Sequence, residues 1–145
     1  MATDIMRGSE ECNCFAVRAA ARHISQAYDR FLAPTGLRAS QFSILSKLKQ
    51  NGRLTINALA DVMAMDRTTL GRNILPLERD GLIGIERAAS DRRAKELHLT
   101  KAGEKRFEAA RKKWSAAQAR FEGAFGASRA ADLRSLLRAL TASEL

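Results

Sequence analysis

The segment from Leu54 to Gly103 constrains the fold most, because it has the pattern of two short helices, a tight turn and a β-hairpin with a basic tip. Thr55 and Asp66 are N-cap residues, and apolar positions follow each of them at helical spacing. The first set is Ile56, Leu59, Val62 and Met63, and the second is Leu70, Ile74 and Leu77. This order of elements predicts a winged helix-turn-helix, which places one helix in the major groove of DNA and the hairpin beside it.

The second helix of this unit is expected to have two faces. Gly81 is placed to end it as a C′ residue, with Leu82 folded back on Leu77 in a Schellman-type contact. At about 100° per residue, another set of residues lies opposite the apolar face. Its members are Thr68, Arg72, Leu75 and Arg79. We therefore expect this opposite face to be available to DNA.

A β-hairpin is predicted after the second helix. Strand-like alternation occurs in residues 82–87 and 94–99, and a polar loop lies between them. The charged residues of that loop are Asp91, Arg92 and Arg93. A flexible arginine at such a tip can enter the minor groove, where narrow A·T tracts concentrate negative potential. Phosphate repels a carboxylate, so we expect Asp91 to brace an arginine, with Arg87 across the hairpin as its partner.

Composition favours a single, mainly helical domain that binds a polyanion. The chain has 145 residues, 46% of them hydrophobic, which is enough for a core. Its net charge of +9 attracts nucleic acid. No apolar stretch of about 18 residues predicts a membrane span, and the first residues lack the pattern of a secretory signal. With two cysteines one residue apart, a poor disulfide framework, these features predict a cytoplasmic protein that does not associate with membranes.

Long helical patterns flank the central unit. The first covers about residues 10–32, and Ser40 is expected to cap a shorter second helix. Thr100 is expected to cap another long helix, whose apolar residues form an a/d seam. The seam consists of Phe107, Ala110, Trp114, Ala117, Phe121 and Ala124, and a last helix carries Leu133, Leu136, Leu137 and Leu140. The seam has no evident partner within one chain, so we expect a homodimer whose two recognition helices, roughly 34 Å apart, read a palindrome.

The central motifs resemble the multiple-antibiotic-resistance regulator (MarR) family of bacterial transcription factors. The matching blocks are Leu59-Ala60, residues 66–70, residues 77–83, Asp91-Arg92-Arg93 and residues 97–103. The resemblance implies a mostly α fold with a small β-wing, in one domain over residues 1–145. The winged helix-turn-helix would lie at about residues 38–100, and dimerisation helices at about residues 10–33 and 101–142. It also implies a transcriptional regulator rather than an enzyme, a repressor that a small-molecule signal releases from DNA.

Two groups of residues are candidates for contact with double-stranded DNA. In the recognition helix, Arg72 can pair with a guanine through two hydrogen bonds, a contact worth about 1–3 kcal/mol of discrimination. The threonines there can contact phosphate or a thymine methyl group, and the arginines of the hairpin tip can enter the minor groove. The full set is Ser40, Arg67, Thr68, Thr69, Arg72, Asn73, Arg92 and Arg93, with Arg87 and Asp91 supporting the wing. The alternative for each is an ordinary solvated surface residue.

The resemblance also implies a site for the signal. The family's usual effector site is a crevice between the dimerisation helices and the winged unit, and its walls here would come from the first, second and fifth helices. Tyr28, Phe31, Phe42 and Phe107 are the candidate lining residues. The alternative for each of these aromatic residues is an ordinary place in the core.

The two cysteines offer a different signal. Cys14, at the start of the first helix, resembles the organic-hydroperoxide-sensing branch of the family, in which a cysteine here is oxidised. Tyr28 falls where that branch has a tyrosine, whereas Arg18 and Ala39 stand at the positions of two others. Arg18, one helical turn from Cys14, would favour the thiolate. Cys12 and Cys14 point about 200° apart on a helix, so they cannot form a disulfide with each other unless the helix unwinds.

Three other interpretations compete with this one. One cysteine can be a small buried hydrophobe, and neither a metal site nor a cofactor is expected. A thiol-redox enzyme built on Cys12 and Cys14 does not fit, because the common dithiol motif has two intervening residues and a βαβ context. A helical interaction protein without DNA binding is the remaining alternative, and the paired arginines of the hairpin tip argue against it.

Overall fold

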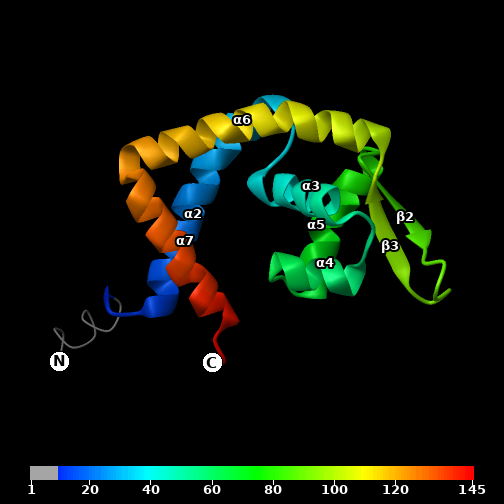
Figure 1. The fold of residues 1–145 in the computed structure, drawn as a ribbon, viewed down its shortest axis with the longest axis horizontal. Coiled ribbons are helices and arrows are strands. Elements are labelled where there is room, and N and C mark those ends of the chain that lie inside the picture. The colour runs from blue at the N-terminus through cyan, green and yellow to red at the C-terminus, as the bar shows by residue number, and fades with distance from the viewer. Residues whose placement is uncertain (1–9) are drawn as a thin grey trace.

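The computed structural model describes residues 10–145 and is mostly helical with a small sheet, as predicted (Figure 1). The helices are α2 (Asn13–Leu32), the 3-10 helix η1 (Ala33–Thr35), α3 (Ala39–Asn51), α4 (Ile56–Met63), α5 (Arg67–Arg79), α6 (Lys101–Phe125) and α7 (Ala127–Ala142). The strands are β1 (Leu54–Thr55), β2 (Ile83–Arg87) and β3 (Lys95–Leu99). None of the helices in this part of the chain is both long and apolar enough to span a membrane.

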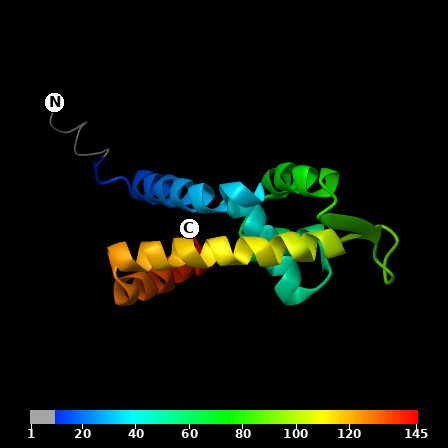
Figure 2. The same cartoon turned by 90° about the horizontal axis from the view of Figure 1, so that it is seen from above.

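Helix α6 runs along the length of the molecule and joins its two ends. In Figure 1 the hairpin, α3, α4 and α5 lie at one end of α6, and α7 and the first part of α2 lie at the other. The view from above shows α2 and α6 as two adjacent rows (Figure 2), and these helices contact each other. The winged unit and the terminal helices are therefore held on one shared helix.

The sheet has three antiparallel strands in the order β1-β3-β2. Ile83 pairs with Leu99 and Arg87 with Lys95 in the hairpin, while Leu54 of β1 pairs with Leu97. Both hairpin strands were predicted, within one residue at each start. Strand β1 was not, because two residues are too short to show an alternating pattern.

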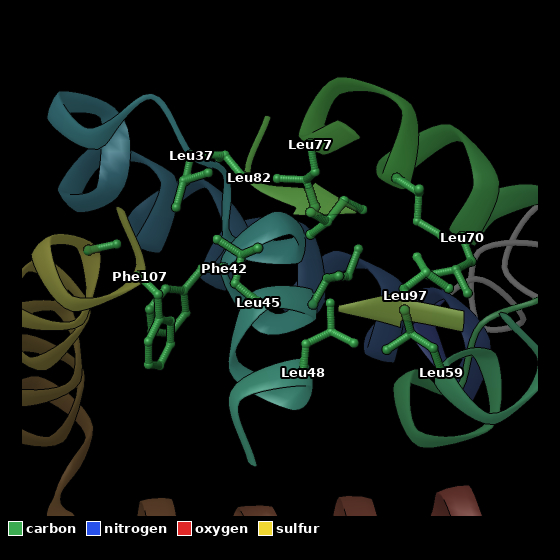
Figure 3. Close-up of a cluster of buried hydrophobic side chains, with 14 of the residues drawn as sticks. Leu37, Phe42, Leu45, Leu48, Leu59, Leu70, Leu77, Leu82, Leu97 and Phe107 are labelled. Carbon is green, nitrogen blue, oxygen red and sulfur yellow. The ribbon is translucent and has the colours of Figure 1, made fainter. Parts of the chain in front are cut away.

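The core lies in the winged unit and extends onto α6 (Figure 3). Its fully buried large side chains come from α2, α3, α4, α5 and the hairpin region. They are Leu32, Ile44, Leu45, Leu59, Leu70, Leu77, Leu82 and Leu97. Burying one such leucine stabilises the fold by about 1.5–3 kcal/mol. Because every element of the unit contributes to this cluster, α5 and the hairpin are fixed relative to each other.

Local capping interactions begin α4, and begin and end α5, where they were predicted to. The side chain of Thr55 accepts a hydrogen bond from the Ala58 N–H, and that of Asp66 accepts one from Thr69. At the other end of α5, Gly81 has φ +71°, and the Leu82 N–H donates to the Leu77 carbonyl at 2.9 Å. This is the expected Schellman contact.

Ser40 does not cap α3, which corrects the sequence prediction. The helix begins two residues earlier than a cap at Ser40 would imply, at Ala39, with Arg38 as its N-cap residue. The Asp29 Oδ1 atom accepts a hydrogen bond from the Ala39 N–H at 2.7 Å, and the Gln41 side chain accepts one from the Arg38 N–H at 3.0 Å. The Asp29 carboxylate of α2 thus accepts a backbone N–H at the start of α3, as Ser40 was expected to do. Asp29 lies ten residues before Ala39, and local capping rules do not reach that far.

The apolar seam of α6 has a partner within the chain from Phe107 to Ala117, contrary to the sequence prediction. Phe107, Ala110 and Ala117 are buried in a single chain. The ring of Phe42 stacks on Phe107 with centroids 5.3 Å apart and on Trp114 at 5.9 Å. Helices α2 and α3 therefore cover this part of the seam.

Apolar surface without a partner in the chain lies instead on the terminal helices. At the start of α2, Phe15 is 60% exposed. On α7, Leu136 is 69% exposed, and Leu137 and Leu140 are exposed as well. Exposed apolar residues that gather on neighbouring elements in this way are typical of an interface.

Candidate nucleic-acid interface

The exposed face of α5 carries the residues predicted for the recognition helix. Thr68, Arg72, Leu75 and Arg79 are all exposed, while Leu70, Ile74 and Leu77 on the opposite face are buried. The helix starts firmly, because Asp66 Oδ1 accepts from the Thr69 N–H at 2.6 Å and Oδ2 accepts from the Thr69 hydroxyl at 3.1 Å. These two hydrogen bonds hold the pKa of Asp66 below its usual value, and the Arg72 guanidinium lowers that pKa further. Arg72 therefore follows an ordered first turn of α5.

Ser40 and Asn73, both predicted to contact DNA, bond to each other. The Ser40 hydroxyl donates to Asn73 Oδ1 at 3.0 Å, and Asn73 Nδ2 donates to the Thr69 carbonyl at 2.9 Å. Both residues are half-buried. They join α3 to α5, so they hold the recognition helix in place whether or not they also reach DNA.

The wing is a short hairpin closed by a turn that Asp91 organises. Asp91 Oδ1 accepts a hydrogen bond from the Arg93 backbone N–H at 2.9 Å, and the Ala88 N–H donates to the Ala94 carbonyl at 2.9 Å. Within residues 10–145 no ion pair joins Asp91 to Arg87, so the brace acts through the backbone of Arg93 rather than through the predicted partner. Arg92 and Arg93 are both exposed.

A polar cluster that no sequence pattern predicts supports the wing. Arg53 Nη1 donates to Glu86 Oε2 at 2.8 Å, and His98 Nε2 lies 4.0 Å from Glu86 Oε1. The hydrogen bond from Arg53 and its charge hold the pKa of Glu86 below its usual value. The ring of His98 covers Gly84, where a Cβ atom would lie 2.4 Å from it. No sequence motif signals these contacts, because they join β2 to β3 and to the loop before β1.

Cations from the recognition helix and the wing converge between them. A pocket of about 330 Å³ is lined by Thr55, Ile56, Asn57, Arg67, Arg93, Ala94 and Lys95. Arg67 and Arg93 were predicted to contact DNA separately, and the structure places them around one space. Lys95 was missed, because its position in β3 gives no sign that it faces α5.

Two pockets lie beside the helices expected to hold an effector. One, of about 550 Å³, is formed by α2 and α6 and includes Tyr28 and Phe31. A smaller one, of about 170 Å³, is formed by α2, α3 and α6 and includes Tyr28 and Phe42. Phe107, in contrast, belongs to the core, where it is 6% exposed and stacked on Phe42.

Tyr28 lines both pockets, as Ile24 does. Its hydroxyl donates a hydrogen bond to the Gln118 side chain across the gap between α2 and α6. Partial burial raises the pKa of Tyr28, and the nearby Glu122 carboxylate raises it further. The hydroxyl therefore stays protonated well above neutral pH, as a hydrogen-bonding group that a ligand between α2 and α6 would meet.

Both cysteines are free and exposed at the start of α2. Cys12 lies just outside the helix as its N-cap residue, and its Sγ accepts a hydrogen bond from the Phe15 N–H at 3.4 Å. Cys14 is in the first turn, and Arg18 is exposed one turn later. The interpretation of either cysteine as a buried hydrophobe is therefore wrong for the single chain.

Comparison with known proteins places the winged unit in a known group. Residues 37–95 match the model of the MarR family. An uncharacterized helix-turn-helix-type transcriptional regulator of Bacillus subtilis (strain 168), YwoH, is 33% identical over 92 residues, which are 63% of this chain and 66% of YwoH. The aligned part is thus just under two thirds of that relative.

Solved structures extend the similarity to nearly the whole chain. The Mycobacterium tuberculosis transcriptional regulator MosR, in complex with DNA, is 36% identical with a TM-score of 0.79, and the match covers 93% of this chain and 100% of MosR. The transcriptional repressor CouR, bound to a 23-mer DNA duplex, is 26% identical with a TM-score of 0.81, over 90% of this chain and 93% of CouR. In both relatives the fold is seen on DNA.

Proposed function

Because the chain belongs to the MarR family of transcriptional regulators, we propose that it binds a palindromic operator in double-stranded DNA as a homodimer and represses transcription. The role is regulatory and not enzymatic. The observation that carries the proposal is the exposed face of α5, which presents Thr68 and Arg72 beside a wing with Arg92 and Arg93 at its tip. We place the protein in the cytoplasm, where its operator would be.

The geometry supports different roles for the recognition helix and the wing. In winged helix-turn-helix proteins the recognition helix lies in the major groove, where guanine offers two acceptors to one arginine. Arg72 is exposed in the first half of α5, the part of a recognition helix that reaches base edges. The wing tip then lies over the adjacent minor groove, where Arg92 meets the negative potential of A·T tracts.

The dimer is proposed to form through α7 and the first part of α2. Their exposed apolar side chains, described above, have no partner in one chain. A second copy would cover them and would bring two α5 helices to successive turns of one face of the duplex. The alternative is a helical interaction protein without DNA binding. It does not explain why the exposed faces of the recognition helix and the wing carry cations.

A small molecule in the crevice at Tyr28 is the proposed releasing signal. The pocket is lined by α2, which would take part in the dimer, and by α6, which joins the winged unit to α7, so a ligand there would change the angle between the two winged units. A shift of a few ångströms would mismatch both half-sites at once. Oxidation of Cys14 is the second candidate signal, which its exposure at the start of α2 favours.

Operator binding can be tested directly with the purified protein. Fluorescence anisotropy with the DNA upstream of its own gene and of the neighbouring genes should show tight binding to one fragment, with random duplex as competitor. Arg72→Ala should lose about tenfold or more in affinity for that fragment, because one bidentate contact to guanine is lost. Its affinity for random duplex should stay the same.

Arg79→Ala is the matched control. Arg79 is exposed on the same face, in the last turn of α5, and its Nε atom lies 3.7 Å from Asp80 Oδ1. Its loss should not change the preference for one base pair. Equal losses of Arg72→Ala on operator and random DNA would refute the assignment of α5 as the recognition helix.

A further inference from the structure

We propose that the pocket between α4, α5 and the base of the wing holds one phosphate of the DNA backbone in each half-site. Arg67, Arg93 and Lys95 are its cationic ligands. The inference rests on the proposed function and adds to it, because it assigns to Arg93 a phosphate rather than the minor groove. It also brings Lys95 and Asn57 into the interface.

The charges around this pocket fit an anion. Its three cations come from three places in the chain: the first turn of α5, the turn of the hairpin and the start of β3. No carboxylate is among the residues that line it. Within residues 10–145 none of the three cations takes part in an ion pair. Three like charges face one space without neutralisation, which favours an anionic ligand.

Hydrogen-bond donors and size fit a phosphate as well. Thr55, Ile56 and Asn57 line the pocket at the start of α4, where the first backbone N–H groups lack partners within the helix. A helix N-terminus attracts anions, so the start of α4 adds to the attraction that the three cations exert. The volume of about 330 Å³ admits a phosphodiester group with some of its water. The lining has no aromatic ring on which a base would stack.

The position of the pocket determines which part of DNA reaches it. With α5 in the major groove and the wing tip over the adjacent minor groove, the strand of backbone that separates the two grooves must pass between them. The pocket lies between α5 and the wing. A phosphate of that strand therefore enters it, and the clamp fixes the wing and the recognition helix on the same strand.

Arg92 and Arg93 are neighbours with different roles in this arrangement. Arg93 lines the pocket, and its backbone N–H is tied to Asp91 at 2.9 Å, which fixes the turn at this residue. Arg92 is exposed and does not line the pocket. The structure thus offers an adjacent arginine as the matched control for Arg93.

The test pairs protein variants with single uncharged methylphosphonate linkages in the operator. The operator is the fragment found above, or a duplex selected from a random library with the purified protein. For the wild type, one linkage in each half-site should lower affinity by about tenfold or more, as expected for loss of charge-assisted hydrogen bonds. Arg93→Gln and Arg67→Gln should bind more weakly to the natural operator, yet lose less than about twofold at that same linkage, because its partner is already gone.

Arg92→Gln should keep the full penalty at that linkage, although it binds more weakly overall. Lys95→Gln is a second test of the pocket and should behave as Arg93→Gln and Arg67→Gln do. Because all four side chains are exposed, the variants should fold, which circular dichroism checks. If Arg93→Gln and Arg67→Gln keep the wild-type penalty at every linkage, the phosphate site is refuted and operator binding stands. If the wild type binds no duplex, the proposed function itself is refuted.

Discussion

The carbonyl oxygen of Leu82 lies 1.9 Å from the place that a Cβ atom of Gly103 would occupy. The first turn of α6 therefore packs directly on the backbone at the start of the hairpin. Thr100 strengthens this junction, since its N–H donates to the Leu82 carbonyl at 3.2 Å and its hydroxyl donates to the Gly81 carbonyl at 2.6 Å. At this point the winged unit is joined to the helix that leads to α7.

Gly103→Ala should destabilise the protein because backbone atoms at this junction cannot move aside. Overpacking of this kind costs about 1–3 kcal/mol, and we expect the midpoint of urea unfolding to fall accordingly. Gly123→Ala in the same helix is the control. A Cβ there meets nothing within 4 Å, so the better helix propensity of alanine should stabilise α6 by up to about 1 kcal/mol. An unchanged midpoint for Gly103→Ala would contradict the packing described here.

Interactions between residues close in sequence could be predicted, and those between distant residues could not. Thr55, Asp66 and Thr100 each bond to a backbone N–H three residues ahead, so a short motif identifies them as caps. The partner of Phe107 is Phe42, which no local pattern links to it. The seam of α6 was therefore assigned wholly to a dimer, although its residues Phe107, Ala110 and Ala117 are buried within one chain.

The candidate site shows the same limit. The exposed face of α5 follows from helical periodicity alone, and so does the basic tip of the wing from its turn residues. The bond between Ser40 and Asn73 and the convergence of Arg67 with Lys95 depend on the packing of α3, α5 and the hairpin. Such groupings appear only when the tertiary structure is known.

The dimer should depend on the exposed leucines of α7. Light scattering at micromolar concentration should give about twice the chain mass of 15.9 kDa for the wild type. Leu136→Asp combined with Leu140→Asp should give a monomer, because two charges would be buried in the interface without partners. Leu75→Asp is the control, since Leu75 is 64% exposed but lies on α5; it should remain a dimer. A monomeric wild type would refute both the dimer and the palindromic operator.

The cap of α5 should make stability depend on pH in the acid range. Hydrogen bonds from Thr69 lower the pKa of Asp66 in the folded state. Its charged form therefore stabilises the fold above the unfolded pKa of about 3.9, and this contribution is lost as pH falls through the lower folded pKa. Asp66→Asn keeps a cap oxygen without the charge. Urea unfolding should show the wild type more stable at pH 6, with the difference shrinking below about pH 4. A difference independent of pH would contradict this assignment.

The last prediction separates the two candidate signals. An organic hydroperoxide would oxidise the Cys14 thiolate to a sulfenic acid and leave an alcohol. A disulfide formed from it with another thiol or a second subunit would strain the start of α2, next to the surface proposed for the dimer. Titration with hydroperoxide should then release wild type and Cys12→Ser from the operator, while Cys14→Ser stays bound. If Cys14→Ser responds as the wild type does, or if none of the three responds, Cys14 is not the sensor. The releasing ligand would then be sought in the pocket at Tyr28, where Tyr28→Phe removes the hydroxyl that bonds Gln118 and should weaken the response to that ligand.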